Sequence, residues 1–389
     1  MDKVRLPDQN GNINEEQLST PREFDLKLSK DIPRKVYSAV HVVSDPLSDH
    51  NPWLKAAIDW EETLNFRRHL WRLGLGVAEA MDTAQRGMGL GWLEAKELIR
   101  HSLDAAKDFP DAEIVCGCGT DQLSHDMNLT IDLVIRAYEE QMEFIEKQGG
   151  KMVIMASRAL TKCAKSPDDF TKVYSRILDQ AKEPVIIHWL GEMFDHQLKG
   201  YWGQIDIHAA MDECLSILSC NAKKIDGIKI SLLDKHKEIS MRRRLPKGLK
   251  MYTGDDFNYP ELIAGDEQGY SDALLGIFDP IATVARAALV ALGEEDLQKY
   301  NEILLPTLPL SRHIFKAPTQ FYKTGVVFLA YLNGHQKHFT MIGGQQSARS
   351  LHHLVELFRL ANKCGILNDP PLAAKRLSDV MKLYGFDSK

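Results

Sequence analysis

From residue 36 onward, short apolar runs alternate with longer amphipathic stretches along the chain. The eight apolar runs lie at residues 36–44, 77–83, 113–120, 151–157, 185–190, 225–231, 249–256 and 271–280. Short apolar runs that end at Gly, Pro, Asp or Ser are typical of buried β-strands. The pattern therefore predicts eight strands.

The stretches between these runs carry the signals of helices. Residues 58–73 are amphipathic and stop at Gly74, residues 93–108 end before Pro110, and residues 129–147 and 207–218 have the same periodicity. Ser166 followed by Pro167 is a strong helix start, with serine as the cap and proline in the first turn. Each strand–helix unit spans roughly 30–40 residues, the size of a right-handed parallel unit.

Eight such units predict a (β/α)8 TIM barrel. An open doubly wound sheet is the alternative, but no glycine-rich phosphate loop follows the first strand. We expect three regions: an N-terminal extension at residues 1–35, the barrel at 36–290, and a C-terminal helical region at 291–389. Breaks in that last region are expected near Pro306, Pro318 and the Gly343–Gly344 pair.

Composition narrows the class of protein. The chain has 389 residues, 44% of them hydrophobic and 26% charged, which is typical of a globular protein. Its net charge of -6 argues against a nucleic-acid partner. No apolar run is long enough for a membrane span, and the polar N-terminus lacks the core of a signal peptide, so we expect a cytoplasmic protein. Cys116 and Cys118 are too close for a CxxC pair and are expected to be packed thiols.

In such a barrel, chemistry lies at the carboxyl ends of the strands. Polar residues gather there around one lysine, Lys229, in the segment IDGIKIS. Burial lowers the pKa of a lysine, and a neutral amine can attack a carbonyl to form a Schiff base. The alternative is a lysine that extends to water at a strand end.

Several segments occur in the order found in the dihydrodipicolinate synthase and N-acetylneuraminate lyase superfamily. They are the Ile58–Glu61 opening, the stretch GVAEAMDTAQRG, the strand EIVCGCGT, the lysine strand IDGIKIS and the turn MYTGDD. From about residue 36 to about residue 302 the chain resembles this superfamily, and within it a bacterial branch of unknown function.

The resemblance implies a class I lyase or aldolase. Lys229 would form an imine with a 2-oxo acid or keto-sugar acid, and the imine would drive cleavage or condensation of a carbon–carbon bond. No organic cofactor or metal is then needed. Thr83 falls on the superfamily's first threonine, which holds the substrate carboxylate or relays protons, and Gly254 falls beside the substrate. The resemblance also implies a homodimer or homotetramer acting on a small carbonyl compound.

The chain departs from the superfamily at several site positions. Its Thr-Thr-Gly-Glu turn becomes Thr83-Ala84-Gln85-Arg86, and its Pro-Tyr-Tyr ending becomes Ser157-Arg158-Ala159. His188 stands where a tyrosine shuttles protons. A histidine can do this with a pKa nearer neutrality, and the alternative is a hydrogen-bonded histidine of the barrel.

Two arginines could grip a substrate carboxylate, namely Arg158 and Arg86. The alternative is an ion pair with Asp82 or Asp255. The predicted catalytic residues are Lys229, His188 and Thr83, and the predicted substrate-binding residues are Arg158, Ser157, Asp82, Arg86, Gly254 and Asp255.

Two other functions stay open. A metal-dependent sugar isomerase or class II aldolase would use divalent-ion ligands such as His41, Glu79, His188 and Asp255. A non-catalytic barrel could bind a sugar acid as a sensor, although a binding protein gains little from the desolvation of Lys229.

Overall fold

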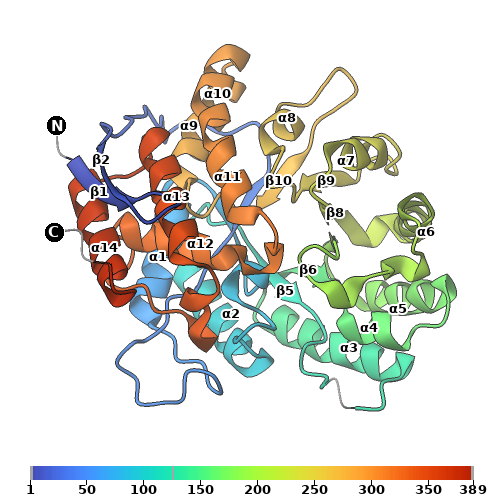
Figure 1. Cartoon of the computed structure of the whole chain (residues 1–389). Helices are drawn as coiled ribbons and strands as arrows, with labels where there is room; N and C mark the ends of the chain where they lie inside the picture. Colours follow the sequence, from blue (N-terminus) through green and yellow to red (C-terminus); the bar gives the residue numbers. More distant parts are fainter. Residues whose placement is uncertain (1–2, 125–126, 387–389) are drawn as a thin grey trace.

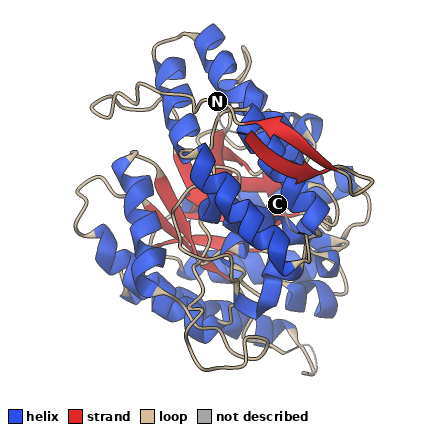
Figure 2. Cartoon of the chain, turned by 60° about the vertical axis from the view of Figure 1, so that its left-hand side comes forward, coloured by secondary structure: helices blue, strands red, loops and turns tan. Residues whose placement is uncertain are grey.

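The computed structural model describes residues 3–124 and 127–386. Eight parallel strands close into a barrel with helices around it, which confirms the predicted (β/α)8 fold (Figures 1 and 2). Around the barrel the strands follow in the order β3 (Val36–Ala39), β4 (Gly76–Glu79), β5 (Ile114–Cys118), β6 (Lys151–Met155), β7 (Val185–Leu190), β8 (Ile225–Ser231), β9 (Lys250–Thr253) and β10 (Asp272–Leu275).

Helices follow the strands around the barrel, and those predicted from the sequence are among them. They are α1 (Trp60–Arg72), α2 (Trp92–Ala106), α3 (Ile131–Lys147), α4 (Arg158–Cys163), α5 (Pro167–Gln180), α6 (Ile207–Cys220), α7 (Lys235–Arg242), α8 (Tyr259–Ala264) and α9 (Ala282–Gly293). Asp59 and Thr130 cap α1 and α3 by accepting a backbone N–H of the first turn. Ser166 is the N-cap residue of α5, with Pro167 in the first turn as predicted.

The chain after α9 is helical, as expected. It forms α10 (Leu297–Leu304), α11 (Leu308–Phe315), α12 (Tyr322–Leu332), α13 (Leu351–Lys363) and α14 (Pro370–Leu383). The predicted breaks lie between these helices. Pro306 is in a 3-10 turn, Pro318 lies between α11 and α12, and Gly343 and Gly344 have φ angles of 65° and 67°. Helix α9 runs across residues 290 and 291, so the barrel continues into this region without a linker.

The N-terminal extension carries a hairpin that its polar sequence did not predict. Strands β1 (Lys3–Pro7) and β2 (Ile13–Gln17) pair antiparallel and lie against the C-terminal helices (Figure 1). Arg359 on α13 donates to Glu16 at 2.6 Å, and Asn362 accepts the Ser19 backbone N–H at 2.8 Å. Hydrogen bonds therefore join the N-terminal extension to helix α13.

The barrel interior is apolar at one end and polar at the other. Tyr37, Ala39, Ala78, Val115, Val153, Ile186, Tyr252 and Leu274 belong to one buried cluster inside the barrel. Side chains alternate along a strand, so His188 follows Ile186 on the inner face of β7, and Lys229 follows Gly227 on β8. The polar pair thus lies nearer the carboxyl ends of the strands than the apolar layer.

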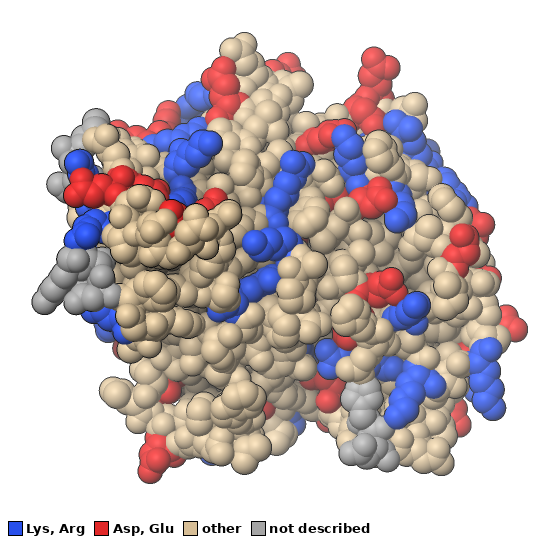
Figure 3. Space-filling view, viewed as in Figure 1, with Lys and Arg blue, Asp and Glu red and all other residues tan. Residues whose placement is uncertain are grey.

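Cys116 and Cys118 are buried free thiols, as predicted, and burial raises the pKa of both. On the face shown in Figure 3, Lys and Arg side chains are interspersed with Asp and Glu. None of the helices in the described part of the chain is long and apolar enough to cross a membrane.

Candidate active site

Lys229 lies on the inner face of β8, between His188 of β7 and Tyr252 of β9. Its side chain is buried, with 4% of the residue exposed. Burial lowers the pKa of Lys229, although the carboxyl groups of Asp82 and Asp256 oppose that shift. A lysine with a lowered pKa provides the neutral amine that a carbonyl addition requires.

Gly254 leaves the space that Lys229 occupies. A Cβ atom at position 254 would lie 2.8 Å from Lys229 Cε and 2.3 Å from Ser231 Oγ. Any larger residue would therefore displace the lysine or the serine. The structure brings Gly254 next to Lys229, where the resemblance placed it beside the substrate.

His188 is a buried neighbour of Lys229. Its Nε2 lies 3.1 Å from Ser231 Oγ. Burial, together with the adjacent Lys229, lowers the pKa of His188 well below its usual value, and Asp82 opposes this only in part. The imidazole is therefore neutral near pH 7 and can exchange a proton with the serine hydroxyl.

Asp82 and Thr83 begin a 3-10 turn just after β4. The hydroxyl group of Tyr322, on α12, contacts both side chains. The Tyr322 hydroxyl donates to Asp82 Oδ2 at 2.6 Å and lies 2.7 Å from Thr83 Oγ1. Because the tyrosine proton is directed to Asp82, Thr83 donates to the tyrosine oxygen. The three side chains form a continuous hydrogen-bonded chain at the mouth of the barrel.

Asp82 carries a negative charge in this buried position. Burial opposes ionisation, but Lys323, then Lys229 and His188, hold the pKa of Asp82 below its ordinary value. One carboxylate thus faces two lysines, and one of these lysines was not predicted from the sequence.

The turn after β9 contains two aspartates with different roles. The Asp255 carboxylate accepts the backbone N–H groups of Phe257 and Asn258 at 2.9 and 3.1 Å, which fixes its own turn. Asp256 is deeply buried, and burial raises its pKa to about 8, although its Oδ1 accepts the Ile277 N–H at 2.8 Å. Asp256 rather than Asp255 is therefore the aspartate of this turn that interacts electrostatically with Lys229.

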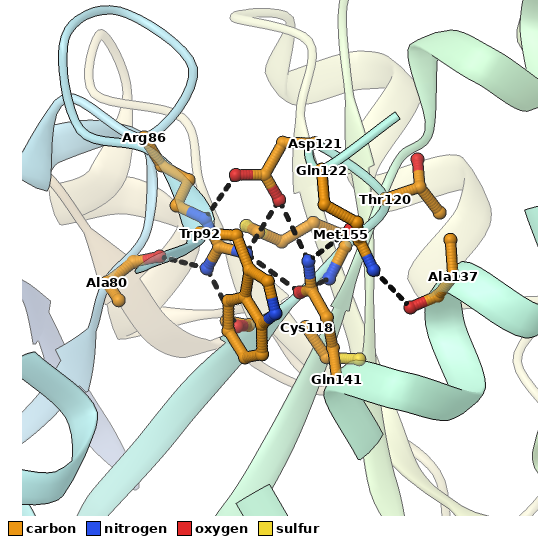
Figure 4. A network of polar contacts seen from close by, with 12 residues as sticks. Ala80, Arg86, Trp92, Cys118, Thr120, Asp121, Gln122, Ala137, Gln141 and Met155 are labelled. Carbon is orange, nitrogen blue, oxygen red and sulfur yellow. Dashed lines mark hydrogen bonds and ion pairs between the residues drawn. The ribbon is translucent and has the colours of Figure 1, made fainter. Parts of the chain in front are cut away.

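Arg86 is held inside the protein by a dense network (Figure 4). It forms a two-pronged ion pair with Asp121 at 2.7 and 2.6 Å and donates to Gln141 at 2.7 Å. It also donates to the carbonyl oxygens of Ala80 and Gly117, each at 3.1 Å. All five N–H donors of the guanidinium have protein acceptors. We therefore assign Arg86 a structural role in holding the loops of the site, and not the binding of a substrate carboxylate.

Ser157 and Arg158 follow the carboxyl end of β6 and have different partners. Ser157 Oγ accepts the Leu160 N–H at 3.0 Å, which caps α4, and it also lies 2.6 Å from Thr120 Oγ1. Arg158 donates from Nε to Asp195 at 2.5 Å, and about a third of its side chain is exposed. The ion-pair partners of the two arginines are therefore Asp195 and Asp121, not the predicted Asp82 or Asp255.

A cavity of about 300 Å³ opens beside these residues. Four of the predicted site residues line it, namely Asp82, Arg86, Arg158 and His188. Lys323 lines it as well, whereas Lys229 lies deeper, next to Asp82 and His188. A ligand in this cavity therefore meets the carboxylate and the imidazole that adjoin the buried lysine.

Sequence reasoning missed Tyr322 and Lys323. They begin α12, in which every residue is buried, and they lie about 240 positions away from Asp82 and Thr83 in sequence. A lysine within an otherwise apolar helix was the one local signal available.

The residues considered for a metal site have other partners. His41 Nδ1 lies 2.7 Å from Asp279, and Glu79 forms a buried ion pair with Arg67 at 2.8 Å. Among the described residues, no group of three or more His, Cys, Asp or Glu side chains is arranged to hold a metal ion.

Fold and site together define a (β/α)8 barrel with a buried lysine near the carboxyl end of its sixth barrel strand, β8. The chain belongs to a family of proteins of unknown function, DUF993, whose model matches residues 4–386. A comparison with functionally curated proteins finds no match.

Solved structures with the same fold include several dihydrodipicolinate synthases. A chloride-inhibited synthase from Acinetobacter baumannii, complexed with pyruvate, matches with a TM-score of 0.64 and 13% identity, covering 86% of this chain and 100% of that one. A dihydrodipicolinic acid synthase family protein from E. coli K12, also with pyruvate, matches with a TM-score of 0.63 and 14% identity, covering 91% of this chain and 99% of that one. The synthase from Aquifex aeolicus matches with a TM-score of 0.61 and 13% identity, covering 90% of this chain and 98% of that one. At this level of identity the similarity establishes the shared fold.

Proposed function

We propose that this protein is a class I lyase or aldolase that forms an imine between Lys229 and a 2-oxo acid or keto-sugar acid. The observation that supports this most directly is the position of Lys229. Its amine is buried on the inner face of β8 with a lowered pKa, next to an ionised carboxylate and a neutral imidazole. A dihydrodipicolinate synthase with the same fold has been solved with pyruvate, a 2-oxo acid.

The first steps follow from this arrangement. The neutral amine of Lys229 adds to the ketone carbon, and loss of water from the resulting carbinolamine gives the imine. Protonation makes the imine an electron sink, so a carbon–carbon bond one atom away can break or form. The Asp82 carboxylate stabilises the positive charge of the protonated imine.

Proton transfer in this scheme has two routes. One is the hydrogen-bonded chain from Thr83 through Tyr322 to Asp82. The other is the contact of His188 with Ser231, the residue two positions beyond Lys229 on the same face of β8. In both routes the proton moves between side chains that lie in hydrogen-bond range of one another, and a substrate bound at Lys229 would meet the ends of these routes at Asp82 and Ser231.

Borohydride trapping tests the proposal. Protein incubated with pyruvate, other 2-oxo acids or keto-sugar acids and then reduced should gain the mass of the reduced adduct, and peptide mapping should place it on Lys229. Lys229→Ala should remain folded and lose both adduct and turnover. Because Lys323 also faces the cavity, mapping must separate the two amines. An adduct on Lys323, or full turnover in Lys229→Ala, would refute the proposal.

Assembly and location are part of the same proposal. The superfamily resemblance supports a homodimer or homotetramer acting on a small carbonyl compound in the bacterial cytoplasm. Sedimentation of the purified protein measures the oligomeric state directly, and a monomer at micromolar concentration would contradict it.

A further inference from the structure

Lys323 is a buried cation without a carboxylate partner in ion-pair range in the described part of the chain. Only 4% of the residue is exposed, in a helix whose other members are apolar apart from Tyr322, Thr324 and Tyr331. Its Nζ donates to the Gln320 carbonyl at 3.1 Å and lies 3.5 Å from Met88 Sδ. The Tyr322 ring centroid also lies 4.6 Å from this nitrogen. A carbonyl, a thioether and a ring face carry no full negative charge, so they offset only part of the lost hydration of an ammonium group.

Arg158 places a second cation on the same cavity. Its Nε is held by Asp195, while its terminal nitrogens have no hydrogen-bond partner within residues 3–124 and 127–386. They lie beside Gly87, where a Cβ atom would be 3.1 Å from one of them. Lys323 and Arg158 are close enough to interact electrostatically, and both line the cavity.

The carboxylates around the cavity leave Lys323 without an ion-pair partner of its own among the described residues. Asp195 is paired with Arg158, and Arg86 is paired with Asp121. Asp82 is then the carboxylate that acts on both Lys323 and Lys229. A ligand with an additional anionic group would supply the direct ion-pair partner that Lys323 lacks.

We propose that Lys323 and Arg158 form an anion subsite in this cavity, so that the substrate is a dianion with a second carboxylate or phosphate beside its 2-oxo acid group. This inference rests on the proposed function, because the 2-oxo acid end is the part that reaches Lys229. A small dianion fits a cavity of about 300 Å³. The substrate class is thereby narrowed from 2-oxo acids in general to those with an anionic group at the other end.

The first experiment compares two probes in borohydride trapping, pyruvate as a monoanion and 2-oxoglutarate as a dianion. The wild-type protein should be half-labelled at a 2-oxoglutarate concentration at least tenfold below that of pyruvate. Lys323→Met removes the charge and keeps an apolar side chain of similar length, and it should reduce this preference at least tenfold. Lys299→Met, at an exposed lysine, is the matched control and should keep the preference.

The second experiment needs no imine. Calorimetry measures the binding of glutarate, which lacks a ketone, and of inorganic phosphate to the wild-type protein and to Lys323→Met. Tighter binding of glutarate identifies the subsite as one for carboxylate, and tighter binding of phosphate identifies it as one for phosphate. In either case Lys323→Met should weaken binding at least tenfold.

The outcomes separate the two proposals. Binding of glutarate or phosphate that depends on Lys323, without any adduct on Lys229, would retain the subsite and refute the imine. A pyruvate adduct on Lys229, with equal labelling by 2-oxoglutarate and no binding of glutarate or phosphate, would retain the imine and refute the subsite. The result that refutes the subsite is measured on the wild-type protein alone, so that refutation does not depend on folding of the variant.

Discussion

The Tyr322 hydroxyl donates a 2.6 Å hydrogen bond to Asp82 Oδ2, and this bond joins a helix of the C-terminal region to the mouth of the barrel. The same hydroxyl lies 2.7 Å from Thr83. The C-terminal region is therefore part of the candidate site and not an appendage to it. Any proton that reaches the site through Thr83 passes through a side chain that lies beyond the barrel.

Tyr322→Phe should slow turnover by roughly a hundredfold, the usual contribution of a positioned proton-transfer group. The ring remains, so its stacking on Phe315 is retained, and the free energy of unfolding should fall by about 1.5–3 kcal/mol, the usual contribution of a hydrogen bond to a charged group. Steady-state kinetics and urea unfolding measure the two effects.

Tyr300→Phe is the matched control for this variant. Tyr300 is also buried, and its hydroxyl donates to the Pro260 carbonyl at 2.8 Å, away from the cavity. It should lose about 1 kcal/mol of stability, because its acceptor is a neutral carbonyl, and it should keep its turnover. Wild-type turnover in Tyr322→Phe would remove Tyr322 from the proton route.

His188 should control the acid side of the pH profile. Burial and Lys229 lower its pKa, so the imidazole stays neutral to a pH below 6.5. If neutral His188 is the base, kcat/KM should stay constant down to pH 6.5 and fall only at lower pH. The sequence alone suggested a fall near pH 6.5, the ordinary pKa of histidine. His188→Phe should slow turnover by roughly a hundredfold and abolish this fall. A rate and pH profile that do not change in His188→Phe would assign His188 to the structure of the barrel alone.

Metal removal separates the imine mechanism from a metal-dependent one. The side chains of His41 and Glu79 are already paired with Asp279 and Arg67, so we expect full activity after dialysis against a strong chelator. Elemental analysis of the purified protein provides the second readout. Loss of activity that is restored by adding a divalent ion would instead favour the class II alternative.

The barrel was predictable because each strand and helix carries a local signal. A buried parallel strand is a short apolar run, and helix caps such as Asp59 and Thr130 are local too. The sequence pattern extended the first barrel strand too far at its carboxyl end. Residues 40–43 are buried like β3 before them, but the hydrogen bonds between β3 and its neighbouring strands stop at Ala39. Beyond that point the backbone has other partners, because the His41 N–H donates to the Asp279 carboxylate.

The candidate site was predictable only where it lies on strand ends. Lys229 and His188 follow from the rule that barrel chemistry occurs at the carboxyl ends of strands. Tyr322 and Lys323 reach the site through the packing of α12, and no spacing along the chain encodes that contact. Strand β2 was missed for another reason. None of its residues is buried, so it lacks the apolar alternation that marks a strand.

Glu238 provides a test of the electrostatics beneath the site. This buried carboxyl on α7 accepts hydrogen bonds from Thr253 at 2.9 Å and Ser271 at 2.7 Å, and it thus holds the strand that leads to Gly254. Burial raises its pKa from 4.5 to about 8. The carboxyl is therefore protonated in the folded protein at neutral pH, whereas the unfolded chain ionises above pH 4.5.

A raised pKa in the folded state gives stability that is lost as the pH rises. Between about pH 4.5 and pH 8 the unfolded chain releases this proton and the folded protein keeps it, so the free energy of unfolding should fall by on the order of 3–5 kcal/mol. Glu238→Gln has no proton to release and should flatten this part of the profile. Urea unfolding at pH 5 and pH 8.5 measures the difference, with the exposed Glu267→Gln as a control that should follow the wild-type protein. Equal slopes in Glu238→Gln and wild type would show that Glu238 ionises in the folded protein as it does in the unfolded chain, and that burial does not raise its pKa.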